Sequence, residues 1–76
     1  MSSLRSPEYQ EFVSRLIDAR KKSGITQAEL AEQLGKPQSF VSKYERLERR
    51  LDVVEYVRIA SQLGIEPLDL FISSKG

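Results

Sequence analysis

The stretch that decides the fold is GITQAELAEQLGKPQSFVSKYE, residues 24–45. Thr26, followed three residues later by Glu29, is a capping box, and this pattern predicts the start of a helix. Gly35 suits the end of that helix, because glycine readily takes the backbone conformation found just after a helix. Pro37 suits the first turn of a next helix. The stretch therefore predicts two short helices joined by a tight turn.

The residues before this stretch predict one longer helix. Ser6 is a suitable N-cap, Pro7 is a favourable first helical residue, and basic residues followed by Gly24 suit its end. Its apolar residues recur at spacings of three and four, which is typical of a helix with one buried side. These residues are Tyr9, Phe12, Val13, Leu16 and Ile17.

The residues after the stretch predict two further helices. Asp52 with Glu55 is a second capping box and opens a helix that Gly64 ends. Its expected inward residues are Val53, Tyr56, Val57, Ala60 and Leu63. A fifth short helix is expected to begin at Glu66 and Pro67 and to bury Leu68, Phe71 and Ile72.

The predicted fold is all-α with five helices, because apolar and polar residues never alternate cleanly enough to indicate a strand. A chain of 76 residues has room for one small core, so we expect a single domain over residues 1–76 with an ordered core of about 7–72.

Composition excludes most enzyme chemistry. The chain has no cysteine and no histidine, which rules out disulfides, Cys/His metal sites and histidine general bases. No cofactor is expected. No apolar run approaches the roughly 18 residues of a membrane span, and MSSLRSPEYQ, residues 1–10, lacks an apolar signal core. We therefore expect a cytoplasmic protein with no membrane partner.

Positive charge is concentrated in the middle of the chain. Residues 36–50 carry five basic and two acidic side chains, whereas residues 51–76 carry two basic and four acidic ones. Such a segment is either a solvated surface or a surface for a polyanion.

Two short helices joined by a two-residue turn are typical of a helix-turn-helix, whose second helix lies in the DNA major groove. Residues 24–45 resemble the helix-turn-helix of the phage-repressor-like, XRE-type family of bacterial and phage transcription regulators. The resemblance continues through IASQLGI, residues 59–65, and covers nearly the whole chain. It implies a five-helix, lambda-repressor-like domain that binds double-stranded operator DNA as a homodimer and regulates transcription, probably as a repressor.

The resemblance also assigns roles to single residues. Gln27 is expected to contact a phosphate and to brace the recognition helix. The expected base contacts are Gln38, Ser39, Ser42 and Lys43. Their chemistry agrees with this role, because Gln pairs with adenine N6 and N7 and Lys reaches guanine O6 and N7. The alternative is that polar residues simply favour the first turn of a helix.

Lys36, Arg46, Arg49 and Arg50 place cationic side chains beside the motif, where phosphates are expected. Leu47 stands where the family usually has glycine. Because leucine resists the left-handed backbone conformation, we expect the recognition helix to run on or to turn differently there.

Two further expectations concern the interior. The resemblance pairs Arg20 with Glu45 as an interior salt bridge, the alternative being two exposed charges. Phe40 either packs against Tyr44 or contacts a thymine methyl, and packing is favoured because an aromatic on a helix is more often part of the core.

A single recognition helix reads too few base pairs for useful specificity, so two half-sites about 34 Å apart and a homodimer are expected. The expected interface is Leu70 on the free side of the fifth helix, with Ile65 at its flank.

Two rival functions were weighed. An enzyme would need a reactive group such as a Ser39–Lys43 dyad, but nothing indicates a pocket around it, and no enzyme is expected. A helical protein-interaction module, or an antitoxin-like subunit without independent DNA reading, is the more serious alternative. Repressor, restriction-modification controller and antitoxin subunit stay open, and no small-molecule effector is expected.

Overall fold

A computed structural model describes residues 6–67 of the chain. Its elements are four helices, α1 (Pro7–Lys22), α2 (Gln27–Leu34), α3 (Gln38–Glu45) and α4 (Val53–Leu63), and this part contains no strand. The all-α prediction is therefore confirmed, with four described helices where five were expected. The fifth was expected to start at Glu66 and Pro67, which are not helical, and the rest of it lies outside the described residues.

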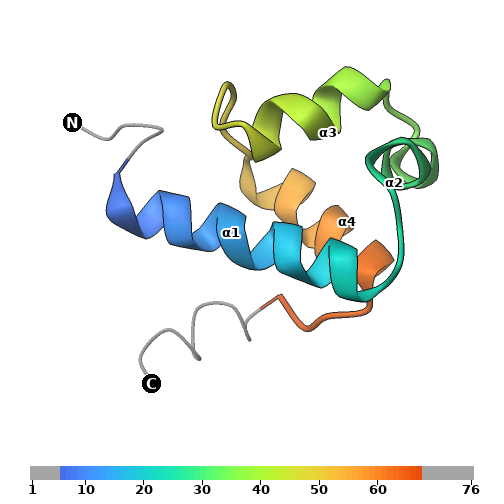
Figure 1. The fold of residues 1–76 in the computed structure, drawn as a ribbon, viewed down its shortest axis with the longest axis horizontal. Coiled ribbons are helices and arrows are strands. Elements are labelled where there is room, and N and C mark those ends of the chain that lie inside the picture. Colours follow the sequence, from blue (N-terminus) through green and yellow to red (C-terminus); the bar gives the residue numbers. More distant parts are fainter. Residues whose placement is uncertain (1–5, 68–76) are drawn as a thin grey trace.

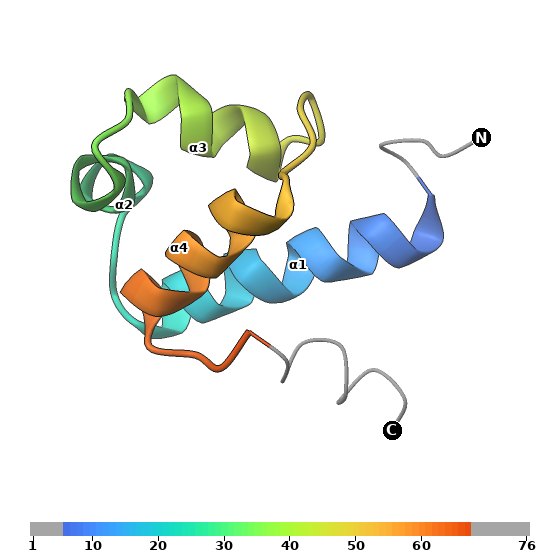
Figure 2. The same ribbon diagram turned by 180° about the vertical axis from the view of Figure 1, so that it is seen from behind.

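The helices pack around one another with α3 at one edge of the molecule. Figure 1 shows α1 and α4 crossing each other, α3 lying above them, and α2 at the end where α3 begins. Figure 2, the view from behind, shows α4 in front of α1 and α3 again along the upper edge. The recognition helix predicted from sequence is therefore a surface helix with one side turned to solvent.

The helices begin where the sequence predicts, because side chains satisfy their first backbone N–H groups. Ser6 accepts a hydrogen bond from the backbone N–H of Tyr9 at 3.2 Å. Both capping boxes are formed. In the first, Thr26 Oγ1 accepts from the N–H of Glu29 at 3.1 Å, and the Glu29 carboxylate accepts from the N–H of Thr26 at 2.9 Å.

All four helices end with the same backbone motif, and one of them corrects an expectation. Beyond each helix, a backbone N–H donates to the carbonyl five residues earlier, as in Glu48 N–H to Lys43 O at 2.8 Å. The left-handed residue in the motif is a glycine after α1, α2 and α4, but after α3 it is Leu47, with φ 64°. The expectation that leucine would extend or redirect α3 is therefore wrong.

The position of Leu47 suggests why the strain is tolerated. A left-handed backbone costs an L-residue about 1–2 kcal/mol. The half-buried Leu47 side chain lines a depression on α1 together with Val13 and Ile17, so its packing offsets part of that cost.

The core is a single cluster to which all four helices contribute, and four of its nine buried residues lie on α4. Its members are Leu16, Leu30, Ala31, Val41, Tyr44, Tyr56, Ile59, Ala60 and Leu63.

The buried side of α4 differs from the predicted one. Tyr56, Ala60 and Leu63 are buried as expected, and so is Ile59, which was not predicted. Val53, Val54 and Val57 are 76%, 60% and 43% exposed, so the expectation that Val53 and Val57 point inward is wrong. Both stripes satisfy helical spacing, and contact with the other helices selects one of them.

Candidate nucleic-acid interface

The side of α3 that faces solvent carries the predicted base-reading residues. Val41 and Tyr44 are fully buried on the opposite side. Gln38, Ser39 and Lys43 are exposed and Ser42 is half-buried, with its hydroxyl 3.4 Å from the carbonyl oxygen of Ser39. The structure thus places the four residues on one surface of a helix that a core holds from behind.

A buried charged network fixes the C-terminal end of α3. Arg20 on α1 forms a bidentate ion pair with Glu45, with Nε 2.8 Å from Oε2 and Nη2 3.1 Å from Oε1. Both side chains are largely buried, at 11% and 6% exposed. Arg20 also donates to the carbonyl oxygen of Ile25 at 2.9 Å, so most of its N–H groups are satisfied. We call Arg20, Glu45 and Gln27 the anchor.

Gln27 completes the anchor from the start of α2. Its side-chain nitrogen donates to Glu45 Oε1 at 2.8 Å, which is the bracing contact that the sequence predicts. A side-chain amide nitrogen carries two hydrogens, so the same group is able to donate to a phosphate as well. The anchor therefore joins α1, α2 and α3 at one point.

Electrostatics at the anchor follow from burial and pairing. The hydrogen bond to Glu45 raises the pKa of Arg20, so the guanidinium stays charged at any pH at which the protein is folded. Burial raises the pKa of the neighbouring Tyr44 well above its usual value, and the charge on Glu45 adds to this. The Tyr44 hydroxyl is buried without a hydrogen-bond partner in the described part of the chain.

Phe40 packs against the protein rather than pointing outward from α3. Its ring meets that of Tyr44 edge-on, with centroids 5.9 Å apart. Lys36 Nζ lies 5.4 Å and the Arg49 guanidinium carbon 4.8 Å from the Phe40 centroid, both within reach of a cation–π interaction. Of the two roles considered for Phe40, the structure favours packing.

The cationic side chains of the loop between α3 and α4 have acidic or aromatic partners. Arg46 pairs with the exposed Glu48 at 3.1 Å, so it still lies at the solvent surface beside α3. Arg49 makes a bidentate pair with Glu55 at 3.0 and 3.2 Å. These acidic partners were missed from sequence, because residues two and six apart in a loop follow no regular spacing.

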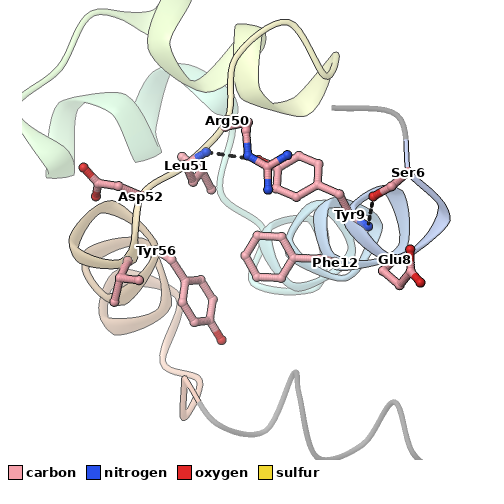
Figure 3. Close-up of a pocket in the computed structure, with 9 residues that line it drawn as sticks. Ser6, Glu8, Tyr9, Phe12, Arg50, Leu51, Asp52 and Tyr56 are labelled. Carbon is pink, nitrogen blue, oxygen red and sulfur yellow. Dashed lines mark hydrogen bonds between the residues drawn. The ribbon is translucent and has the colours of Figure 1, made fainter. Parts of the chain in front are cut away.

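Arg50 lies away from α3. Its guanidinium carbon is 4.5 Å from the centroid of the Tyr9 ring on α1, and Figure 3 shows the two groups stacked. The next backbone N–H, of Leu51, donates to the Tyr9 hydroxyl at 3.0 Å. Any phosphate contact by Arg50 would therefore be made beside α1 rather than beside the recognition helix.

An open pocket lies next to Arg50, between the starts of α1 and α4. It has a volume of about 320 Å³ and is mostly apolar, with Tyr9, Phe12, Leu51 and Tyr56 among its lining residues (Figure 3). The Tyr56 hydroxyl donates to the carbonyl oxygen of Pro67.

The predicted interface residues are only partly described. Ile65 is half-buried and packs against the core of its own chain. Leu70 lies outside the described residues. Within residues 6–67, no cluster of three or more potential metal ligands is present, and no helix is long and apolar enough to cross a membrane.

Comparisons with known proteins agree with this geometry. The chain is similar to an XRE-family like protein from Pseudomonas syringae pv. tomato str. DC3000, with 48% identity and a TM-score of 0.84 over 87% of this chain and 80% of that one. It is also similar to the restriction-modification controller protein C.AhdI from Aeromonas hydrophila, with 36% identity and a TM-score of 0.73 over 80% of this chain and 92% of that one. No curated protein matches the chain.

The model of the HTH_3 helix-turn-helix family matches residues 16–70, which include all of α2, α3 and α4. The match and the two solved structures agree on a DNA-binding regulator and not an enzyme. The chain therefore belongs to the HTH_3 helix-turn-helix family and is an XRE-type, DNA-binding transcription regulator.

Proposed function

We propose that the protein is a homodimeric repressor that reads a palindromic operator with α3 in the major groove. The observation that carries this proposal is the pairing of an exposed polar surface with a rigid support. Gln38, Ser39 and Lys43 are exposed, while the anchor and the buried Tyr44 fix the side of α3 behind them. Side chains on a fixed helix reach base edges in a defined register.

The proposed base readers differ in what they recognise. The Gln38 amide suits adenine, which presents one acceptor and one donor in the major groove, and the Lys43 ammonium suits the two acceptors of guanine. Ser39 and Ser42 are hydroxyls that accept or donate and so discriminate less. Gln38 and Lys43 are therefore the residues that set the sequence preference.

The proposed phosphate contacts surround α3. Lys36 precedes the helix, Arg46 follows it, and Gln27 lies at the start of α2. Arg49 is engaged with Glu55 and Arg50 with the Tyr9 ring, so each would have to leave an intramolecular partner to reach DNA. We expect Lys36, Arg46 and Gln27 to contribute more than these two.

A role as a restriction-modification controller is the second candidate, and the likeness to C.AhdI supports it. A protein-interaction module is less well supported, because a helix-in-groove partner needs apolar anchors. The outward side of α3 offers polar residues, and Phe40 is turned toward Tyr44.

Selection of bound sequences from a random pool of duplex DNA tests the proposal. We expect a palindromic consensus whose half-sites lie about 34 Å apart along the duplex. If about six phosphates are neutralised per dimer, the logarithm of affinity should fall with the logarithm of salt concentration with a slope near −5. No enriched sequence together with a flat salt dependence would contradict DNA reading by this chain.

A reporter gene separates the two roles. With the selected operator placed over a promoter, a repressor lowers transcription when the protein is supplied. A controller that activates raises it from an operator placed upstream of the promoter. An increase there would replace repression with the second candidate.

A further inference from the structure

The exposed valines of α4 form an apolar surface that the fold does not use. Val53, Val54 and Val57 are 76%, 60% and 43% exposed, in contrast with the buried side of the same helix. Single exposed apolar residues are ordinary, but three on one side of one helix mark a contact surface. We call Val53, Val54 and Val57 the valine face.

The valine face and the reading side of α3 point in different directions. Figure 2 shows α4 in front of α1, with α3 along the upper edge. The outward side of α3 points away from α1 and α4, whereas the valine face points away from the core on the outside of α4. A protein bound to the valine face would therefore leave the reading side uncovered.

Two-fold symmetry makes a second copy of this chain the occupant that fits. A two-fold axis that passes through the valine face, along the direction in which α3 faces outward, leaves both recognition helices on the same side of the dimer. The chain measures 30 × 24 × 20 Å between its extremes. Two copies placed side by side thus separate their recognition helices by a distance comparable with one DNA turn of about 34 Å.

Charge also favours this self-association. Figures 1 and 2 show α4 running across the direction in which α3 faces outward, so such an axis pairs the two α4 helices antiparallel. With the axis between Val54 and Val57, each Val54 lies opposite Val57 of the other copy. Arg58 then falls beside Asp52 of the other copy, and both residues are exposed in the single chain. The surface is therefore complementary to itself in both its apolar and its charged parts.

We propose that the valine face of α4 is the dimer interface and that its occupant is a second copy of this chain. The proposal rests on the proposed function, because reading a palindrome requires two recognition helices. It places the interface on α4, whereas the sequence places it at Ile65 and Leu70. Since three valines form a small apolar centre, the dimer forms in the micromolar range without DNA and tightens on the operator.

Sedimentation without DNA tests the proposal independently of DNA reading. The unmodified chain should be dimeric at about 100 μM, and V54E should weaken dimerisation at least about tenfold, because two carboxylates would face each other across the axis. Val54 is exposed, so helical content measured by circular dichroism should be unchanged. A28E is the matched control, since Ala28 is an exposed apolar residue of α2, and this variant should remain dimeric.

A charge swap separates loss of the interface from loss of folding. V54K alone should also be monomeric, but a mixture of V54E and V54K chains should recover a heterodimer, since opposite charges then meet. A variant that has merely lost its fold would not recover in this way.

Cysteine cross-linking supplies a second readout. The chain contains no cysteine, so an introduced thiol has only the matching thiol to react with. Air oxidation of mixed V54C and V57C chains should give a disulfide-linked dimer, and A28C should not.

Three results would overturn the proposal. One is an unmodified chain that stays monomeric at about 100 μM and gives no V54C–V57C cross-link. Another is a V54E chain that dimerises as well as the unmodified one. The third is dissociation caused by L70E and not by V54E, which would place the interface in the segment after Pro67. A dimer that forms through the valine face but selects no DNA sequence would instead contradict only the proposed function.

Discussion

The inner side of α3 is buried and tied to two other helices, whereas its outer side is open to solvent. On the inner side, Tyr44 lies in the core and Glu45 is held by Arg20 and Gln27. On the outer side, the polar side chains are exposed. The two sides belong to the same eight-residue helix, yet one determines whether the helix is held in place and the other what it is able to touch.

This difference teaches that stability and recognition are separable along one helix. Substitutions on the inner side should change the free energy of unfolding, and substitutions on the outer side should change DNA affinity alone. Variants of single residues test where this separation holds and where it fails.

The largest effect is expected for Glu45→Ala, on the inner side. It removes the partner of a buried guanidinium, which destabilises by about 3–5 kcal/mol. The midpoint of urea unfolding should fall sharply. Glu48→Ala is the matched control, because it removes an exposed carboxylate three residues away that pairs with Arg46. Equal midpoints for the two variants would show that burial of the anchor contributes nothing.

The next effect is expected for Gln38→Ala and Lys43→Ala, on the outer side. Each should cost roughly 1–3 kcal/mol of binding to the preferred site and relax the preference at one position of each half-site. Urea midpoints should not move, because both side chains are exposed. Arg46→Ala, a proposed phosphate contact, should weaken all sequences alike. If the two outer variants do the same, they contact phosphates rather than bases.

Leu47, just beyond α3, should show the cost of its left-handed backbone. Leu47→Ala keeps the strain and loses the side-chain packing, whereas Leu47→Gly loses the packing but relieves the strain. We expect the glycine variant to be more stable than the alanine variant by about 1 kcal/mol, after the extra entropy of unfolded glycine is included. Calorimetric melting of both variants checks this, and an alanine variant of equal or greater stability would contradict it.

The Arg49–Glu55 pair, at the flank of α3, is more exposed than the anchor, and Arg49→Ala should cost only about 1 kcal/mol or less at pH 7. Hydrogen bonds from Arg49 hold the pKa of Glu55 below its usual value. A lowered folded-state pKa stabilises above the unfolded-state pKa of about 4.3, and this contribution is lost as the pH falls through the folded-state value. The difference in urea midpoint between the two proteins should therefore shrink in acid. A constant difference would mean that the pair contributes by packing alone.

The smallest effect is expected for Tyr44→Phe, even though Tyr44 lies on the inner side. The variant removes a buried hydroxyl that has no hydrogen-bond partner among the described residues, so the urea midpoint should stay the same or rise. Burial raises the pKa of Tyr44, so it favours the folded state fully below the unfolded-state pKa of about 10 and ever less as the pH rises above it. The variant should lose less stability in alkali. A clear fall of the midpoint at pH 7 would show that the hydroxyl has a partner.

Local signals in the sequence predict the helix boundaries well. Capping boxes and terminal glycines act through backbone groups within a few residues, so they are readable without tertiary information. The buried side of α4 is less readable, because Val57 and Ile59 both lie within one broad apolar arc. Only contact with the neighbouring helices buries Ile59 and leaves Val57 at the surface.

The candidate site is predictable to the same degree. The resemblance indicated the outer residues of α3 and the pairing of Arg20 with Glu45. It did not indicate that Arg49 would pair with Glu55 or that Arg50 would lie over Tyr9, since these contacts depend on the path of a loop. Leu47 shows the opposite limit, because its backbone preference predicts a different turn from the one that the surrounding structure imposes.

The core cluster bears on how the protein is assembled during synthesis. A nascent chain that has emerged as far as Glu45 already contains both helices of the helix-turn-helix, but eight-residue helices are marginal on their own in water. Four of the nine residues in the core cluster lie on α4, which is made afterwards. The reading surface lies in the middle of the chain, but it becomes fixed in space only when the following helix has been synthesised and has packed beneath it.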